Sequence, residues 1–288
     1  MADSKVKLVK PFNIDRFMAG KLKDRINLIG VELEGGWTNL PSGVKLVHDG
    51  SVQVPQPAPD GPPEQEIWQE IVTLNAQGQQ VVTRVRVPGA IANGAPTKKK
   101  VGWQTGEYPS EPMEVKAVGT WLTAFYPSHV NDTCGLHVHM SFKKALHYQK
   151  LMIPEYQATV IEYLKRWAKE EGFPSNHSIW ARLDGKSTFC KQEFFPAKQV
   201  LAKNKIFEHN GEGNRYTCIN YCYGQHSTIE CRVLPMMEKA PQAIRAVERV
   251  LRITNATLAS LREKEPREIA DVTLGNEGYM DERTEVVI

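Results

Sequence analysis

The sequence predicts an α+β fold, and three observations support this prediction. Short segments with strand-like alternation occur at residues 27–34, 216–223 and 228–234. Two longer segments, at about 155–171 and from Pro241 onward, repeat their apolar residues at helical spacing. The chain has 288 residues, 41% of them hydrophobic, which is enough to build a buried core.

Composition and charge exclude several classes of protein. Lys and Arg number 36 against 33 Asp and Glu, a surplus too small for a general nucleic-acid binder, although residues 98–100 form a local basic run. No segment approaches the roughly 18 uninterrupted apolar residues of a membrane span. The N-terminal residues are rich in Lys and Arg and do not resemble a secretory signal. We therefore expect a cytoplasmic protein without a membrane partner.

The cysteines are expected to be free thiols. Their number is odd, the chain is long, and no CxxC pair occurs, all of which argue against a disulfide-stapled scaffold or a thiolate zinc site. They are Cys134, Cys190, Cys218, Cys222 and Cys231.

The first predicted strand, residues 27–34, carries a pair of carboxylates. Closely spaced apolar residues bounded by Gly35 and Gly36 predict the strand. Because strand side chains alternate between faces, Glu32 and Glu34 project from the same side. Two carboxylates on one face of a rigid element are a first indication of function.

An insertion of about residues 54–102 follows. Its first part, 54–63, holds five prolines and is expected to run extended. Segments 66–74 and 81–87 alternate around a short polar turn and predict a β-hairpin. We expect this insertion to form a flap, the alternative being a solvated basic hairpin.

Two helices and a second hairpin complete the predicted domain. The helix at 155–171 is ended by Gly172 and Pro174, and the later helix has Pro241 at an N-terminal position. Both are expected to cover the core. Residues 216–223 and 228–234 predict a second hairpin. We therefore expect one domain over 1–262 and a charged, mobile tail over 263–288.

Metal-capable side chains recur on the predicted strands. His137 and His139 occupy positions i and i+2, so their imidazoles share a strand face. An HxH pair alone is weak evidence, since it could be a satisfied structural pair, but the combination is far more specific. The metal-capable residues are Glu32, Glu34, Glu107, Glu111, His137, His139 and Glu230.

The types of donor favour Mg²⁺ or Mn²⁺. Several carboxylates with at most two imidazoles suit a hard cation, whereas structural zinc prefers thiolates and catalytic zinc prefers several histidines. So many carboxylates would repel one another unless the site held two or more ions or bridged a polyphosphate. This points to nucleoside triphosphate chemistry.

Three arginines could complement a phosphate. Arg232 follows Glu230 on the same strand face, Arg215 precedes the strand beginning near Tyr216, and Arg182 lies in Trp-Ala-Arg-Leu. An arginine fork matches phosphate or carboxylate oxygens bidentately. The alternative is that each arginine pairs with one of the glutamates.

Six sequence fragments, taken in their order along the chain, resemble the amidoligase family, which is related to glutamine synthetase and glutamate–cysteine ligase. The stretch Gly-Leu-His137-Val-His139-Met-Ser is also similar to a Gly-Met-His-Cys-His-Gln-Ser stretch of glutamine synthetases. The matching fragments are Gly-Val-Glu32-Leu-Glu34, His48-Asp49-Gly50-Ser51, Gly106-Glu107-Tyr-Pro-Ser110, Cys134-Gly-Leu-His137-Val-His139, Asn214-Arg215-Tyr-Thr-Cys-Ile-Asn220 and Thr228-Ile-Glu230-Cys-Arg232.

The resemblance implies a fold and a set of roles. The fold would be a glutamine synthetase-like antiparallel β-sheet whose concave face forms the active-site cleft, with helices on the outer face and the 54–102 insertion as a departure from the pattern. The implied metal ligands are Glu32, Glu34, Glu107, His137 and Glu230, to which we add Glu111, which has no counterpart in the family pattern. His139, Arg215 and Asn220 would contact the nucleotide, and Arg232, Asp49 and Arg215 would be catalytic. To the nucleotide contacts we add Arg182, which lies outside the matching fragments, as one of the three arginines that could complement a phosphate.

The implied activity is ATP-dependent carboxylate–amine ligation, forming an amide or isopeptide bond through an acyl phosphate. ATP and two or more Mg²⁺ or Mn²⁺ ions would be required, and the partners would be a small-molecule or peptide carboxylate and an amine. Asp49 or a cleft glutamate could accept the amine proton. Two alternatives remain open: a zinc hydrolase using His137, His139 and Glu230, and an inactive binding module of the same fold.

Overall fold

A computed structural model describes residues 9–40, 44–55, 68–74, 80–86, 103–192, 216–222 and 228–263. The chain divides into two compact units, Pro55–Trp103 and the remainder. The smaller unit contains a two-stranded antiparallel hairpin, β2 (Trp68–Leu74) and β3 (Gln80–Arg86), which confirms the predicted hairpin. The flap role of the 54–102 insertion stays a prediction, and the tail from residue 264 lies outside the described residues. None of the described helices is long and apolar enough to cross a membrane.

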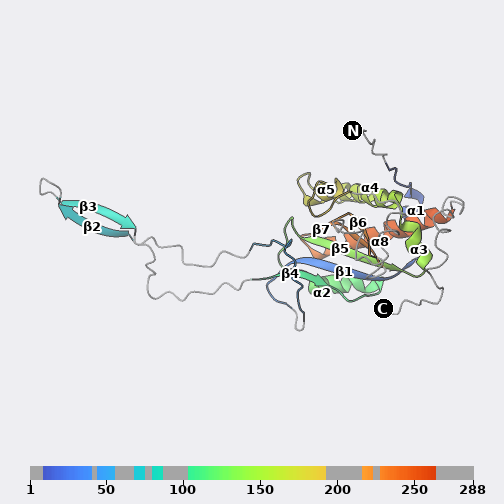
Figure 1. The fold of residues 1–288 in the computed structure, drawn as a ribbon, viewed down its shortest axis with the longest axis horizontal. Helices are drawn as coiled ribbons and strands as arrows, with labels where there is room; N and C mark the ends of the chain where they lie inside the picture. Colours follow the sequence, from blue (N-terminus) through green and yellow to red (C-terminus); the bar gives the residue numbers. More distant parts are fainter. Residues whose placement is uncertain are drawn as a thin grey trace, which may run out of the picture. The chain divides into compact units, whose positions relative to one another are not determined.

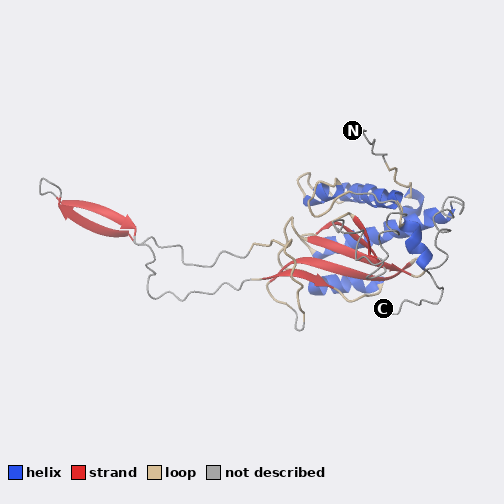
Figure 2. Cartoon of the chain, in the orientation of Figure 1, coloured by secondary structure: helices blue, strands red, loops and turns tan. Residues whose placement is uncertain are grey.

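The larger unit is built on a five-stranded sheet with the order β4-β1-β5-β7-β6, in which all neighbours are antiparallel. The sheet and the helices packed on it (Figures 1 and 2) confirm the α+β prediction. Its strands are β1 (Ile26–Trp37), β4 (Gln104–Pro109), β5 (Gly135–Phe142), β6 (Ile219–Cys222) and β7 (Thr228–Pro235).

Six α-helices and one short 3-10 helix, η1 (Val115–Ala117), accompany the sheet in the described part of the chain. The long helix α8 packs against four of the others, α1, α2, α3 and α4, while α5 contacts β7. The α-helices are α1 (Asp15–Ala19), α2 (Val118–Phe125), α3 (Ala145–Leu151), α4 (Pro154–Glu170), α5 (Ser178–Leu183) and α8 (Ala240–Glu263).

One face of the sheet is apolar and forms the core. Val31, Leu33 and Val138 are fully buried there, as strand alternation requires when Glu32 and His137 point the other way. The Thr254 hydroxyl of α8 reaches the Met140 sulfur at 3.5 Å, so this helix covers the apolar face. The opposite face is consequently left for the acidic and histidine side chains.

The two predicted helices are confirmed with small shifts of their ends. In α4 the predicted apolar stripe is buried, Pro154 stands in the first turn, and Gly172 at φ +74° follows the end of the helix. The Tyr156 hydroxyl lies 2.9 Å from that of Thr254, which joins α4 to α8. These helices are core elements, as expected from their stripes.

The second hairpin pairs as predicted, but its first strand is shorter. β6 begins at Ile219, whereas residues 216–218 form a turn, an isolated bridge and a bend. The Thr217 hydroxyl donates to the Ile219 carbonyl and to the Asn220 side chain, and its backbone bridges in parallel to Lys191. These local bonds compete with the ladder and delay the strand.

Candidate functional site

Cross-strand register brings the predicted side chains into one row across the sheet. Glu34 lies opposite Glu107 and Glu32 opposite His137. His139 lies opposite Glu230, which in turn lies opposite Asn220. The row therefore crosses all five strands, from β4 at one edge to β6 at the other.

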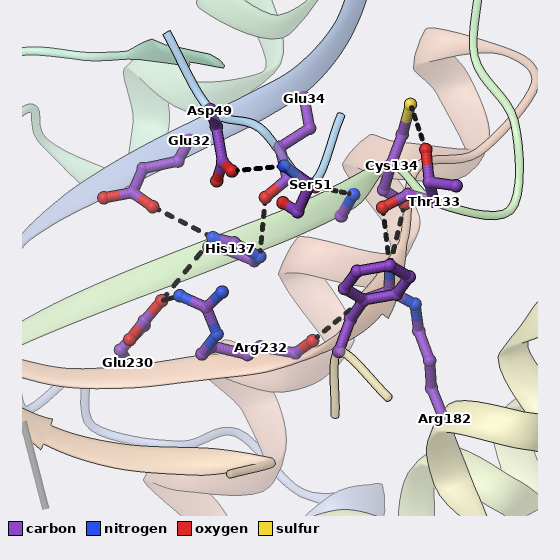
Figure 3. A network of polar contacts seen from close by, with 12 residues as sticks. Glu32, Glu34, Asp49, Ser51, Thr133, Cys134, His137, Arg182, Glu230 and Arg232 are labelled. Carbon is purple, nitrogen blue, oxygen red and sulfur yellow. Dashed lines mark hydrogen bonds and ion pairs between the residues drawn. The ribbon is translucent and has the colours of Figure 1, made fainter. Parts of the chain in front are cut away.

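His137 stands at the centre of this row (Figure 3). Its Nδ1 lies 2.9 Å from a Glu32 oxygen and 3.5 Å from a Glu230 oxygen, while its Nε2 lies 3.4 Å from a Glu34 oxygen. The side chain is 3% exposed. One imidazole thus joins carboxylates from β1 and β7.

Two groups of side chains in the described residues have the geometry to hold a cation. The first group is Glu32, His139 and Glu230, and the second is Glu34, Asp49 and Glu107. Within each group, one ligand atom per residue lies within 4.8 Å of the others. The first group mixes one imidazole with two carboxylates, and the second offers oxygen alone, which suits a hard cation.

Asp49 reaches the second group from a loop rather than a strand. Backbone hydrogen bonds of 2.8 and 2.9 Å between Val47 and Glu107 hold the loop against β4. A Cβ on Gly106 would come within 2.6 Å of the Val47 carbonyl, so glycine is required for this approach. The Asp49 carboxylate accepts from the Ser51 amide at 2.7 Å, which orients it.

Glu34 is fixed by the start of β5. The Gly135 amide donates to a Glu34 oxygen at 2.5 Å. A Cβ on Gly135 would lie 2.6 Å from the His137 Nε2 and 3.1 Å from the same Glu34 oxygen. The absence of a side chain at Gly135 therefore allows Glu34 and His137 to meet.

Glu230 is fully satisfied by charged and polar neighbours. Arg232 donates to one of its oxygens at 2.7 Å, and the Asn220 amide donates to the other at 2.8 Å. A register shift helps to place Arg232, because β7 takes three residue steps, from Cys231 to Leu234, where β5 takes two. The Arg232 Nε is buried and has no hydrogen-bond partner among the described residues.

Burial and neighbouring charges perturb the protonation of the row. Burial opposes ionisation of Glu32, but hydrogen bonds and charges of His137 and His139 hold its pKa far below the usual range. Burial likewise disfavours a charged His139, yet Glu32 and Glu230 raise its pKa. Burial, followed by the charges of Glu32, Glu34 and Asp49, raises the pKa of Glu107 to about 9. The two cation-capable groups are therefore electrostatically connected.

Two predicted residues in the described part of the chain, Arg182 and Glu111, lie outside the row. Arg182 is buried at 1% exposure and donates to the backbone carbonyls of Cys134, at 3.1 Å, and of Arg232, at 3.4 Å, so it joins β5 to β7 instead of facing the carboxylates. Glu111 is exposed and follows the end of β4 at Pro109, so its predicted strand position is wrong. Arg215 lies outside the described residues.

Two residues that help to build the site, Thr228 and Gly135, were given no role by the sequence analysis. The Thr228 hydroxyl lies 3.2 Å from His139 Nδ1 and can fix the orientation of that ring. The Gly135 amide holds Glu34 in place. Both residues lie inside the fragments that match the amidoligase pattern, Thr228 two residues before Glu230 and Gly135 two residues before His137. Their position beside these predicted site residues is the sequence feature that could have indicated their roles.

Comparisons with known proteins do not assign the chain to a family. No protein-family model, curated protein or solved structure gives a significant match to this sequence. The amidoligase resemblance therefore stays a prediction based on the motifs and is taken up below as a proposal.

Cation binding is expected to strengthen as pH rises from neutral to about 9. Glu107 has a pKa raised to about 9, so it is protonated at neutral pH and a cation at Glu34, Asp49 and Glu107 must displace that proton. Mn²⁺ titration by calorimetry, in buffers of different ionisation enthalpy, measures the released protons. Glu107→Gln should release about one proton fewer per ion. Affinity that does not change with pH would contradict this expectation.

Proposed function

We propose that this protein is an ATP-dependent carboxylate–amine ligase that forms an amide or isopeptide bond. The observation that supports the proposal most directly is the pair of cation-capable groups on one sheet face, Glu32–His139–Glu230 and Glu34–Asp49–Glu107, with the Arg232 guanidinium beside Glu230. A site with this charge pattern suits a polyphosphate whose anionic oxygens are shared between cations and an arginine.

The donor atoms fit two divalent ions of the Mg²⁺ or Mn²⁺ type. Three carboxylates converge in the second group, and burial, followed by the charges of Glu32, Glu34 and Asp49, raises the pKa of Glu107, so a cation there would relieve an unfavourable negative charge. Ions bound in these groups would neutralise phosphate charge and polarise the γ-phosphoryl group. His137 lies between the carboxylates of both groups and would keep them in position.

Arg232 is the group best placed to meet a transferred phosphoryl or an incoming carboxylate. Its guanidinium is already oriented by the 2.7 Å bond to Glu230, and this carboxylate, opposing the effect of burial, raises the arginine pKa. Its buried Nε–H, which has no hydrogen-bond partner in the part of the chain that the structure describes, leaves a donor for such a group. Its charge would persist at every pH at which the protein is folded.

The proposed reaction has two balanced steps. An oxygen of the substrate carboxylate attacks the γ-phosphorus of ATP, and the bond to ADP breaks, leaving an acyl phosphate. The amine nitrogen then attacks the acyl carbon, the bond to phosphate breaks, and a cleft carboxylate such as Asp49 accepts the amine proton. Activation is needed because a free carboxylate repels the nucleophile and has a poor leaving group.

A phosphate-release assay tests the proposal. The purified protein is incubated with ATP and Mg²⁺, first alone and then with pooled amines and small carboxylates, while phosphate release and bound metal are measured. Release that requires both pools supports the ligase and allows the pools to be divided to find the substrates. Stoichiometric zinc without ATP binding would favour a hydrolase using His137, His139 and Glu230. Neither zinc nor ATP binding would indicate an inactive module.

A further inference from the structure

Two buried thiols that the proposed reaction does not use lie against each other. The Cys190 and Cys218 sulfurs are 3.4 Å apart, and the residues are 0% and 2% exposed. All five cysteines are free, as the sequence predicts. The Cys134 thiol instead donates to the Asn131 side chain at 3.4 Å, so it provides a comparison within the same protein.

The backbone already holds these two cysteines side by side. The Lys191 amide donates to the Tyr216 carbonyl at 2.6 Å, and the Cys218 amide donates to the Lys191 carbonyl at 2.9 Å. A disulfide requires the sulfurs to approach to about 2.05 Å. Because these two backbone hydrogen bonds hold the segments together, the sulfurs, now 3.4 Å apart, can reach that distance by a small movement of their side chains.

The two thiols are chemically unequal. Hydrogen bonding by Cys218, together with the charges of Arg182 and Arg232, lowers the pKa of Cys190 despite its burial, while the same contact with Cys190 and burial raise the pKa of Cys218. The thiolate is the reactive form of cysteine. Cys190 therefore has the character of an attacking sulfur and Cys218 that of a resolving one.

The residues on either side of Cys190 lie at the protein surface, where Thr188 and Lys191 are exposed. The segment around it lines an open surface pocket that includes Ser187, Thr188 and Lys191. Bulky reagents are excluded by the burial of both sulfurs. A molecule the size of hydrogen peroxide is the kind of oxidant that fits these conditions.

We propose that Cys190 and Cys218 are a redox modification site that closes to a reversible disulfide with a peroxide. The Cys190 sulfur attacks one peroxide oxygen, the O–O bond breaks, and a sulfenic acid and water form. The Cys218 sulfur then attacks the sulfenic sulfur, and a second water leaves. The two thiols lose two electrons and two protons, and one peroxide is reduced to two waters.

The bond would connect the segment after α5 to the edge of the sheet that carries the candidate site. The Cys218 carbonyl accepts from the Arg232 amide at 2.9 Å, and Asn220, two residues further on, contacts Glu230. The cysteines are 28 positions apart, so the closed loop would include Arg215. The state of the two thiols would therefore be linked to the order of this edge.

Peptide mapping of the full chain after treatment with hydrogen peroxide tests the inference. Wild-type protein should lose about 2 Da and yield a tryptic peptide 187–191 joined through Cys190 to Cys218 within peptide 216–232, and dithiothreitol should reverse both changes. Cys134→Ser should form the same link, whereas Cys190→Ser and Cys218→Ser should not.

Two results would overturn the inference. In the first, the folded wild-type protein is treated with a peroxide concentration that oxidises a denatured sample, is then unfolded, and both Cys190 and Cys218 can still be alkylated. The other is a linkage of Cys190 to Cys231 instead of Cys218. The mapping uses neither ATP nor metal, so its outcome is independent of whether the protein is a ligase, and the wild-type result stands even if a variant fails to fold.

Discussion

Replacing Glu32 by Gln is expected to abolish ATP turnover while the protein remains folded. Glu32 connects His137, at 2.9 Å, to His139, at 3.0 Å, and it belongs to the first cation-capable group. Its side chain is 22% exposed, and Gln has nearly the shape of Glu. The change therefore removes charge from the site with little effect on packing. Removing one charged ligand should lower turnover by at least about 100-fold and weaken Mn²⁺ binding.

Glu170→Gln is the matched control for this experiment. It also removes a carboxylate with a positively charged partner, Arg249 at 2.8 Å, but this pair lies on the outer sides of α4 and α8, and Glu170 is 62% exposed. Turnover and circular dichroism should match those of the wild type. Full turnover in Glu32→Gln, with intact metal binding, would show that Glu32 is not a ligand.

Replacing Glu230 by Ala should destabilise the fold itself as well as the site. Glu230 is 1% exposed, and its removal leaves the Arg232 charge and the Asn220 amide buried without their partner. Breaking a buried ion pair in this way typically costs about 3–5 kcal/mol. We expect that loss in the free energy of unfolding, measured by urea titration.

Two further variants separate the effect of burial on stability from the effect of charge, one at Glu230 and one at an exposed ion pair. Glu230→Gln keeps an acceptor oxygen for one of the two donors, Arg232 or Asn220, but removes the charge that balances Arg232, so it should lose stability as well, though less than Glu230→Ala. Glu162→Ala breaks the exposed pair with Arg166, at 3.0 Å on α4, and should change stability by less than about 1 kcal/mol. Equal losses in Glu230→Ala and Glu162→Ala would contradict the buried network.

Strand periodicity was sufficient to place most of the row. Alternation of side chains puts Glu32 with Glu34 and His137 with His139 on one face whatever the rest of the fold. The order of the strands in the sheet could not be predicted in this way, because strand pairing depends on contacts between residues far apart in the sequence. The opposition of Glu32 to His137, and of His139 to Glu230, is such a contact.

Two sequence predictions differ from the structure, each for its own physical reason. Arg182 was expected at the nucleotide, but the backbone carbonyls around it offer hydrogen bonds that its charge can use in the interior. Glu111 was expected on a strand, but β4 ends at Pro109, because proline has no N–H to donate to the strand ladder. The place of Arg182 therefore depends on tertiary contacts that its residue type does not report, whereas the strand end before Glu111 was signalled locally by Pro109.

The most direct test of the account is the transfer of oxygen from a carboxylate to phosphate. The protein is incubated with ATP, Mg²⁺, the amine pool and a carboxylate pool labelled with ¹⁸O, and the released phosphate is examined by mass spectrometry. Acyl-phosphate chemistry predicts one labelled oxygen in each phosphate, and Glu32→Gln should release none. Phosphate that is released at the wild-type rate and takes its new oxygen from water would contradict the ligase.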